Sequence, residues 1–449
     1  MIPMRLSDAA PVLKCRAPAS DASFDQVVTD SRKVRRGALF AALPGSRTDG
    51  HDFAAAAKKL GAAALLVSHP VPVDLPQLQV DDVLIALGRL ANYLRRRLDP
   101  QVVGITGSNG KTTVKEMLSS ILRQQGAVLA TQGNYNNELG VPLSLFGLEE
   151  PHRFAVIEMG AAQLGDIAYL ASIARPDVGL VTNIGPAHLQ GFGSEEQTAR
   201  GKGEMYSALP ADGCAVINAD EPWAPLWQEL STADRAVSFG RAPGCDVRLL
   251  ESGERPRLET PAGPIDIELR LPGRHNLLNA AAAAAAALAL DVEAERIAAG
   301  LAAVRPVAGR LNLIRSGAGW TVIDDTYNAN PASLYSALRV LAELQGTPWL
   351  VLGDMKELGE DSRKMHAEVG DAARAMGVSR LYATGEMAAA TVDAFGAGAR
   401  HFDDRESLVQ TLRDDLRPGV ICLVKGSRSM GMETVVEAIT GPAGLRETG

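Results

Sequence analysis

The chain is poor in cysteine and in aromatic residues, and it carries no strong excess of positive charge. Its four cysteines, Cys15, Cys214, Cys245 and Cys422, are scattered over 449 residues without a CxxC pair. We therefore expect free thiols in a reducing compartment, and neither a disulfide framework nor a cysteine metal site. Aromatic residues make up 4% of the chain and the formal net charge is -8. Few rings for stacking bases and a net negative charge exclude a general nucleic-acid-binding role.

A long apolar run is also missing. The most membrane-like segment, Ala280–Leu290, is shorter than the ~20 residues that a bilayer span needs, and alanine is only weakly hydrophobic. It predicts a helix packed closely inside a domain. The first residues, MIPMRLSDAAPVL, have no charged stretch followed by a long apolar one, so we expect no signal peptide. Together these observations favour a cytoplasmic protein without membrane insertion.

The length and the order of apolar segments predict three α/β domains, since domains of about 100–200 residues are usual. A small α/β domain over 1–97 ends at a basic stretch, Arg95–Arg97, that precedes Pro100. In the second, 98–309, apolar strands at 102–106, 155–158 and 178–183 alternate with helices, which predicts a parallel sheet covered on both faces, with a β-rich insertion at 240–273. The third, 310–449, follows a linker at 304–310 and alternates again from Trp320, as in a Rossmann-like domain.

The segment Gly104–Thr113, GITGSNGKTT, is the most informative part of the sequence. It follows an apolar strand and precedes a helix, as in loops whose backbone N–H groups bind the phosphates of a nucleotide. The spacing departs from the strict pattern, because Ile105 stands where the first glycine should fall. We expect Lys111 to reach the β- and γ-phosphates and Thr112 to contact magnesium. The ATP-binding residues expected here are Gly107, Ser108, Asn109, Gly110, Lys111, Thr112 and Thr113.

Polar residues follow the other strands of the predicted middle sheet, at the edge where open α/β sheets bind ligands. Glu158 ends one strand and His188 follows another, so both could approach magnesium together with Thr112. Oxygen is the atom that Mg²⁺ prefers, which makes Glu158 the stronger ligand and His188 the more unusual one. The alternatives are a capped strand end and a loop histidine. Lys202 stands near the start of a helical segment, where spacing alone favours a solvated lysine.

Three polar clusters follow strands of the third domain, at Asp324–Pro331, Gly353–Glu357 and Lys425–Ser429. One such cluster could be turn chemistry. Three at the same edge of one sheet indicate a rim that faces a ligand. The third domain is therefore expected to bring another reactant to the γ-phosphate of an ATP bound by the middle domain.

Several of these motifs together resemble the Mur ligase family, over essentially the whole chain. They are TGSNGKTT, the segments 157–160, 182–189 and 275–280, and the DDTYNANP cluster. The resemblance implies an ATP-dependent amide ligase: ATP converts a carboxylate to an acyl phosphate, which an amine then displaces. Segments 29–34, 131–142 and 352–359 are most similar to the members that join D-alanyl-D-alanine to UDP-N-acetylmuramoyl-tripeptide in peptidoglycan precursor synthesis.

The resemblance also implies roles for single residues. Thr112 and Glu158 would bind one magnesium ion, His188 would serve a second, and Lys202 would be carbamylated by CO₂, which turns its positive charge into an oxygen anion. Asn276 would contact adenine, and Arg310 and Asp325 the nucleotide. The expected substrate contacts are Ser31, Arg32, Gly45, Asp49 and His51 for the uridine nucleotide, Asn134, Asn136 and Asn137 for the muramoyl peptide, and Tyr327 and Asn328 in the third domain. We expect a monomer.

Two other functions stay open at this point. A folylpolyglutamate synthetase belongs to the same family, but it would need a pteridine pocket, and the Asp30-Ser31-Arg32 and Asn134–Asn137 segments argue against it. A nucleotide-switch or transport ATPase would hydrolyse ATP without joining anything. It would not need separate substrate domains at both ends of the chain.

Overall fold

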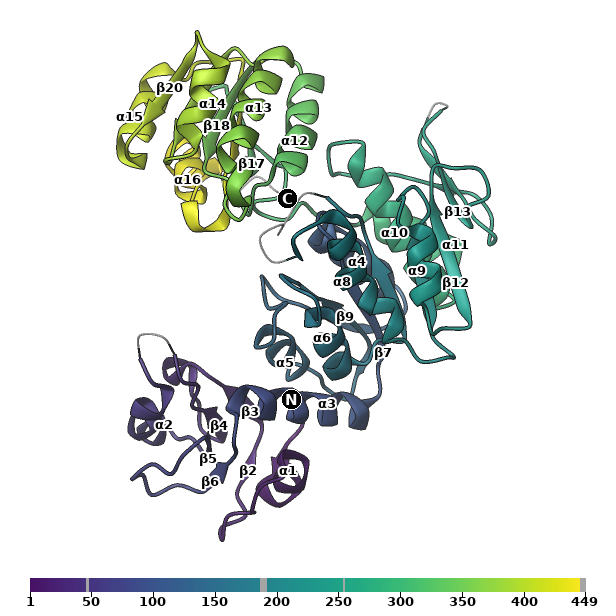
Figure 1. Ribbon diagram of the computed structural model, residues 1–449, viewed down its shortest axis with the longest axis vertical. Helices are drawn as coiled ribbons and strands as arrows, with labels where there is room; N and C mark the ends of the chain where they lie inside the picture. Colours follow the sequence, from purple (N-terminus) through teal and green to yellow (C-terminus); the bar gives the residue numbers. More distant parts are fainter. Residues whose placement is uncertain (46–47, 186–191, 253–254, 445–449) are drawn as a thin grey trace.

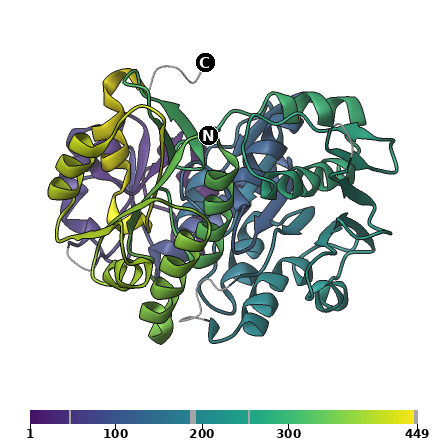
Figure 2. The same cartoon turned by 90° about the horizontal axis from the view of Figure 1, so that it is seen from above.

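The computed structural model describes the chain except for residues 46–47, 186–191, 253–254 and 445–449. Three units, each built on a mainly parallel sheet, follow one another along the chain, and the first and third lie at opposite ends of the middle one (Figure 1). Seen from above, the third unit overlies the first, and the middle unit lies to one side of both (Figure 2). The expected α/β class and three-part architecture are confirmed.

The first unit contains a four-stranded parallel sheet in the order β3-β4-β5-β6. Its central strands, with the sequences ALFA and ALLV, are fully buried, as expected where both faces of a parallel sheet are covered. The apolar segment 24–28 is split at Asp25, because Phe24 pairs with the N-terminal strand β1 and residues from Gln26 on pair with β4. The elements are β1 Met4–Arg5, α1 Leu6–Leu13, β2 Ser23–Phe24, β3 Gln26–Val28, η1 Ser31–Lys33, β4 Ala38–Ala41, η2 Gly50–Phe53, α2 Ala54–Lys59, β5 Ala64–Val67 and β6 Gln77–Gln79.

Helix α3 (Val83–Leu98) joins the first unit to the middle one. The Asp82 side chain caps its N-terminus by accepting the Ile85 N–H (2.9 Å). Arg95, near the other end, is only 5% exposed; it donates to the carbonyls of Ala174 and Arg175, both at 3.0 Å. A cation at these last carbonyls of helix α6 is favourable. Arg95, the first residue of the basic stretch, therefore packs the end of α3 against α6, while Arg96 and Arg97 are exposed.

The middle unit is a nine-stranded sheet in the order β15-β14-β13-β12-β11-β10-β7-β9-β8. The strands from β13 to β8 run parallel, while β14 and β15 extend the sheet antiparallel, which places the expected β-rich insertion at one edge. Side chains alternate between faces: along β9, Phe154 and Val156 pack on one side and Ala155 and Ile157 on the other. The strands are β7 Gln101–Thr106, β8 Ala127–Ala130, β9 His152–Glu158, β10 Val178–Val181, β11 Cys214–Asn218, β12 Arg235–Gly240, β13 Val247–Leu250, β14 Arg257–Glu259 and β15 Ile265–Asp266.

Helices cover both faces of this sheet. On one face the alanine-rich α10 packs against α4, and its small side chains permit a close approach. Among the described residues no helix combines the length and apolar character that crossing a bilayer requires. The helices are α4 Lys111–Leu122, α5 Gly140–Leu145, α6 Asp166–Ala174, α8 Glu195–Ser207, α9 Ala224–Leu230, α10 His275–Ala289 and α11 Ala294–Ala302.

The third unit is a six-stranded sheet in the order β16-β17-β21-β18-β19-β20, with only the edge strand β16 antiparallel. Because β17, β21 and β18 are parallel neighbours, the three polar clusters that follow them share one edge, as expected. The elements are β16 Asn312–Arg315, β17 Thr321–Asp325, α12 Pro331–Glu343, β18 Thr347–Gly353, η3 Gly359–Asp361, α13 Ser362–Ala375, β19 Arg380–Thr384, α14 Ala388–Phe395, β20 Ala399–Phe402, α15 Arg405–Asp415, β21 Val420–Lys425, η4 Arg428–Met430 and α16 Glu433–Gly444.

Candidate active site

A cavity of about 1220 Å³ lies between the middle and third units. Its walls come from the carboxyl ends of strands in both sheets and from the start of α10. Most of the residues expected to bind ATP or the peptide line it. They are Ser108, Asn109, Gly110, Lys111, Thr113, Asn134, Asn136, Asn137, Glu158, Asn276, Arg310, Asp325, Tyr327 and Asn328.

The phosphate loop has the backbone geometry that its glycines allow. Gly107 has φ +140°, and a Cβ there would lie 1.9 Å from the Thr182 hydroxyl oxygen. Gly110 has φ +82°, and its Cβ would meet the Asn279 side-chain oxygen at 2.5 Å. Both positions therefore require glycine. Helix α4 begins directly afterwards at Lys111, which places the positive end of its dipole at the loop.

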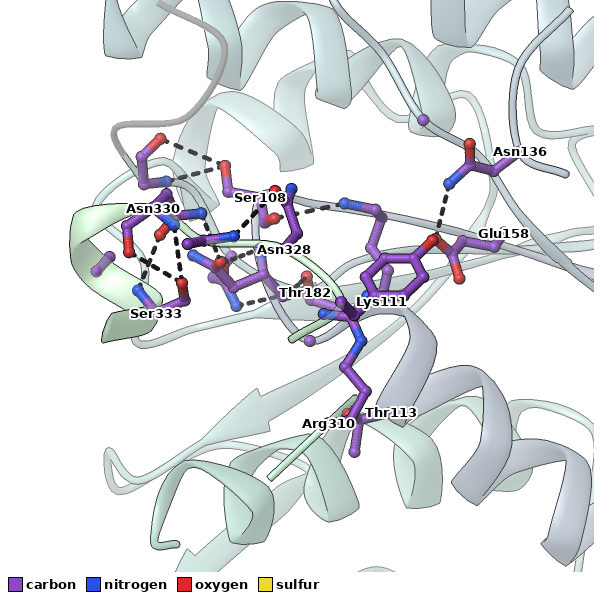
Figure 3. A pocket seen from close by; sticks show the side chains of 18 of the residues that line it. Ser108, Lys111, Thr113, Asn136, Glu158, Thr182, Arg310, Asn328, Asn330 and Ser333 are labelled. Carbon is purple, nitrogen blue, oxygen red and sulfur yellow. Dashed lines mark hydrogen bonds between the residues drawn. The ribbon is translucent and has the colours of Figure 1, made fainter. Parts of the chain in front are cut away.

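Side chains from two neighbouring elements fix this loop. Asn183, just after β10, accepts the Ser108 N–H with its backbone carbonyl and the Asn109 N–H with its side-chain oxygen, both at 2.9 Å. From the third unit, Asn330 Nδ2 donates to Asn109 Oδ1 at 3.0 Å (Figure 3). Asn330 also caps α12, so the first turn of that helix is tied to the phosphate loop. The sequence motifs contained these asparagines without indicating their partners.

Lys111 folds back onto its own loop. Its Nζ donates to the Gly107 carbonyl at 2.6 Å and to the Ser108 carbonyl at 3.4 Å. Burial lowers the pKa of the amine; Glu158 opposes this shift and Arg310 adds to it. A partly desolvated cation at the positive end of the α4 dipole attracts an anionic phosphate strongly.

Thr112 and Glu158 meet at the buried end of the cavity. The Thr112 hydroxyl donates to Glu158 Oε2 at 2.9 Å. The other carboxylate oxygen accepts from Asn136 Nδ2 at 2.9 Å (Figure 3). Arg310, from the linker to the third unit, reaches the Thr112 hydroxyl at 3.2 Å. Glu158 is 2% exposed. A buried carboxylate next to a hydroxyl supplies the oxygen ligands that Mg²⁺ prefers, so these residues fit that ion.

The expectation of a solvated Lys202 near a helix start, which rested on spacing alone, is wrong. Lys202 lies in the middle of α8, not near a helix start, and it is 1% exposed rather than solvated. Its Nζ lies 5.5 Å from the centre of the Phe192 ring, and no hydrogen bond or ion pair joins it to another described residue. Burial, followed by repulsion from Lys111, lowers the pKa of the amine to about 7, against an opposing effect of Asp166. His188 lies outside the described residues.

The nucleotide contacts expected from the linker and the third unit occupy the opposite wall. The Arg310 guanidinium stacks over the Tyr327 ring, 3.9 Å from its centre. Asp325 forms an ion pair with the buried Lys425 and accepts the Leu311 N–H at 3.2 Å. Burial lowers the pKa of the Lys425 amine, while Asp325 opposes that shift. The sequence analysis identified the strand-end cluster that begins at Lys425 but did not predict a site role for Lys425 itself.

Two amides line the cavity while already serving local structure. Asn276, at the start of α10, donates to the Pro272 carbonyl at 2.7 Å and accepts from Asn279 at 3.0 Å. Asn137 accepts the Gly140 N–H at 2.9 Å, just before α5. Both residues line the cavity, and each amide can form hydrogen bonds beyond these.

The residues expected to bind uridine do not line this cavity. Ser31 and Arg32 follow β3, while Gly45, Asp49 and His51 follow β4, so both groups lie at the carboxyl edge of the first sheet. Two Arg32 nitrogens bind the carboxylate of Asp30, whose pKa this hydrogen bonding lowers to about 2. The structure therefore brings these residues together, but away from the phosphate loop.

Asp49, His51 and His69 bring three possible metal-ligand atoms within 4.8 Å of one another. His51 Nδ1 donates to Asp49 at 2.6 Å, however, and its Nε2 accepts the Ser68 N–H at 3.0 Å. Both ring nitrogens are in use, so the cluster fixes a loop rather than offering three free ligands. His69 stacks on the His51 ring at 4.0 Å.

The fold and the cavity define a three-part α/β enzyme in which a phosphate loop faces a second set of polar strand ends. The chain belongs to the Mur ligase family. Family models described as Mur ligase family, catalytic domain, Mur ligase middle domain, and Mur ligase, glutamate ligase domain match residues 23–95, 105–287 and 309–428.

Individual relatives are similar over their whole length. The UDP-N-acetylmuramoyl-tripeptide–D-alanyl-D-alanine ligase of Escherichia coli strain K12 is 43% identical over 447 residues, or 98% of this chain and 99% of that protein. The crystal structure of MurF from Acinetobacter baumannii superposes with a TM-score of 0.90 at 33% identity, covering 98% of this chain and 99% of that one. MurF ligase from Thermotoga maritima in complex with ADP gives 0.82 at 31% identity, with 92% and 97% covered.

Proposed function

We propose that this protein joins D-alanyl-D-alanine to UDP-N-acetylmuramoyl-tripeptide, using ATP and releasing ADP and phosphate, in peptidoglycan precursor synthesis. The observation that carries the proposal is the cavity between two units, with the phosphate loop and Glu158, to which Thr112 is bound, on one wall and charged strand ends on the other. The similarity to a ligase of this name over both complete chains supports the same activity. The reaction belongs in the cytoplasm, and we expect a monomer to carry it out.

The chemistry explains why two walls are needed. A carboxylate is a poor acyl donor because its leaving group would be oxide. Transfer of the γ-phosphoryl group makes an acyl phosphate, and the dipeptide amine then attacks its carbonyl carbon and expels phosphate. Bringing a carboxylate to a triphosphate requires positive charge at the contact, which Lys111, Arg310 and the loop N–H groups supply.

Magnesium and a lysine carbamate complete the proposal. Thr112, Glu158 and His188 would bind magnesium, which neutralises charge on the phosphates when bound. The buried amine of Lys202, with a pKa of about 7, is largely neutral above pH 7 and so can react with CO₂. The resulting carbamate would offer an oxygen anion to a metal.

The substrate peptide would extend from the first unit to the cavity. Ser31, Arg32, Gly45, Asp49 and His51, at one sheet edge of the first unit, are the proposed uridine nucleotide contacts. Asn134, Asn136 and Asn137 line the cavity and would contact the muramoyl peptide. Asn276, at the start of α10, would contact the adenine, while Asp325 would contact the nucleotide and Tyr327 and Asn328 the substrate from the third unit.

Product mass tests this function. The purified protein is supplied with ATP, magnesium, D-alanyl-D-alanine and a UDP-muramoyl-tripeptide carrying either meso-diaminopimelate or lysine at its third position. We expect a UDP-muramoyl-pentapeptide, with one phosphate released per product. A folylpolyglutamate synthetase would instead extend a folate with glutamate, and a plain ATPase would release phosphate with no new amide.

A further inference from the structure

His366, in α13, is completely buried and is not among the residues that line the cavity. Its Nε2 accepts the Met355 N–H at 3.0 Å, and its Nδ1 lies 2.7 Å from the Ser362 carbonyl. A backbone N–H can only donate and a carbonyl can only accept, so these two bonds fix the neutral ring with its proton on Nδ1. The histidine therefore connects the start of helix α13 to the loop turn at residues 354–358, which follows strand β18.

This turn places charged residues on the cavity wall. Met355 is buried in the core of the third unit, whereas the next residues, Lys356 and Glu357, line the cavity together with the partly core-packed Leu358. Glu357 has φ +63°, a left-handed conformation that a side chain of this kind adopts only where the surroundings impose it. The His366 bond to Met355 lies two residues from this strained position.

The opposite side of the turn is bound to the end of β21. Ser427 accepts the Lys356 N–H at 2.8 Å with its hydroxyl, and donates its own N–H to the Asp354 carbonyl at 3.0 Å. Asp354, 1% exposed, fixes the Lys356 ammonium at 2.8 Å. The Lys356 side chain is still 49% exposed, and its ammonium keeps further protons to donate.

We propose that His366 is a positioning residue for the amine substrate: it fixes the turn that presents Lys356 and Glu357 to the incoming dipeptide. This inference rests on the ligase function proposed above. A dipeptide with free ends carries an ammonium group at one end and a carboxylate at the other. The wall formed by this turn and by Arg428 has cations for the carboxylate and an anion for the ammonium group. Lys356 and Glu357 lie on the third unit and the phosphate loop lies on the middle unit, so we expect a change in this turn to affect the dipeptide more than ATP.

Kinetics of three variants test the proposal in the full-length protein. His366→Leu leaves the Met355 N–H without its acceptor and is expected to raise KM for D-alanyl-D-alanine roughly tenfold or more, with KM for ATP unchanged. His366→Gln keeps an acceptor oxygen of similar reach and is expected to restore most of the affinity. Lys356→Met should raise the same KM. The matched control is His152→Gln, since His152 Nδ1 also accepts a backbone N–H, from Glu149 at 3.0 Å, but in the middle unit.

The outcomes separate this inference from the function on which it rests. If the unaltered protein makes no dipeptide-dependent product, the proposed function fails. If it is active and His366→Leu leaves KM for the dipeptide unchanged, the positioning role fails. An equal loss in every kinetic constant for the Leu and Gln variants would mean that His366 serves only general stability, which also overturns the proposal. ADP binding and thermal melting of each variant verify that it is folded.

Discussion

Lys202 is expected to react with CO₂ and to act as an anion. Burial and the nearby charge of Lys111 lower the pKa of its amine to about 7. At pH 8 such an amine is about nine-tenths neutral, whereas an ordinary lysine, with a pKa near 10.4, is neutral in roughly one molecule in 250. Only the neutral amine attacks CO₂, so burial and the charge of Lys111 raise the reactive fraction by about two orders of magnitude.

Two measurements follow from that magnitude. With ¹³C-labelled bicarbonate, the protein should show a carbamate carbon signal that grows as the pH rises through about 7 and disappears in Lys202→Ala. Lys115 is an internal comparison: it is also buried, but its ammonium donates to the Thr131 carbonyl at 2.7 Å and pairs with Glu116, so it should give no signal. Lys202→Ala should lose most of its activity, and acetate should restore part of it.

Rescue by a small amine instead of acetate would refute the anionic role. So would full activity in buffers stripped of CO₂, together with no labelled carbon on the protein. Loss of activity in Lys202→Ala without rescue would be ambiguous alone, because removal of a buried side chain leaves a cavity. The labelled-carbon experiment is therefore performed on the unaltered chain.

Three further outcomes are expected. Lys111→Ala should lower kcat by orders of magnitude, because preorganised charge is among the largest catalytic terms, and near-normal turnover would contradict the phosphate-loop role. ATP turnover should be slow without the peptide substrate and complete only with the dipeptide, since closure of two units assembles the site; rapid hydrolysis of ATP alone would favour a plain ATPase. Arg95→Met should destabilise the joint at α3 by about 2 kcal/mol, because it removes the hydrogen bonds of a buried guanidinium to the Ala174 and Arg175 carbonyls, whereas the exposed neighbour Arg96→Met should leave the melting temperature nearly unchanged.

Local patterns predicted the parts of the site that local geometry determines. The phosphate loop needs a strand, glycines with positive φ and a helix start, and all of these are adjacent in the sequence. The strand-end clusters of the third unit were predictable for the same reason, because parallel strands bring their carboxyl ends to one edge. Among the middle strands, β8, β11 and β12 were missed; β8 is only four residues long and partly exposed, so its burial pattern is weak.

Contacts between distant segments were not predictable in this way. Arg310 reaches Thr112 across 198 positions, and Asn330 reaches Asn109 across 221. The burial of Lys202 likewise depends on how α8 packs against the sheet. The adjacent glycines, Gly201 and Gly203, indicate only that other side chains pack closely against this part of the helix. Such contacts arise from tertiary packing, for which a local pattern carries no signal.

The same contacts explain why nucleotide binding and the placement of the third unit must be linked. The Thr112 hydroxyl already donates to Glu158 and accepts from Arg310, and Lys111 already donates to loop carbonyls. A triphosphate that binds to Thr112 and Lys111 must therefore displace Arg310 from Thr112 and the loop carbonyl from Lys111. Linkage is reciprocal, so any free energy that the nucleotide gains by displacing Arg310 also changes the equilibrium position of the third unit. That unit carries the wall for the second substrate, and the amine can therefore be admitted in response to the nucleotide.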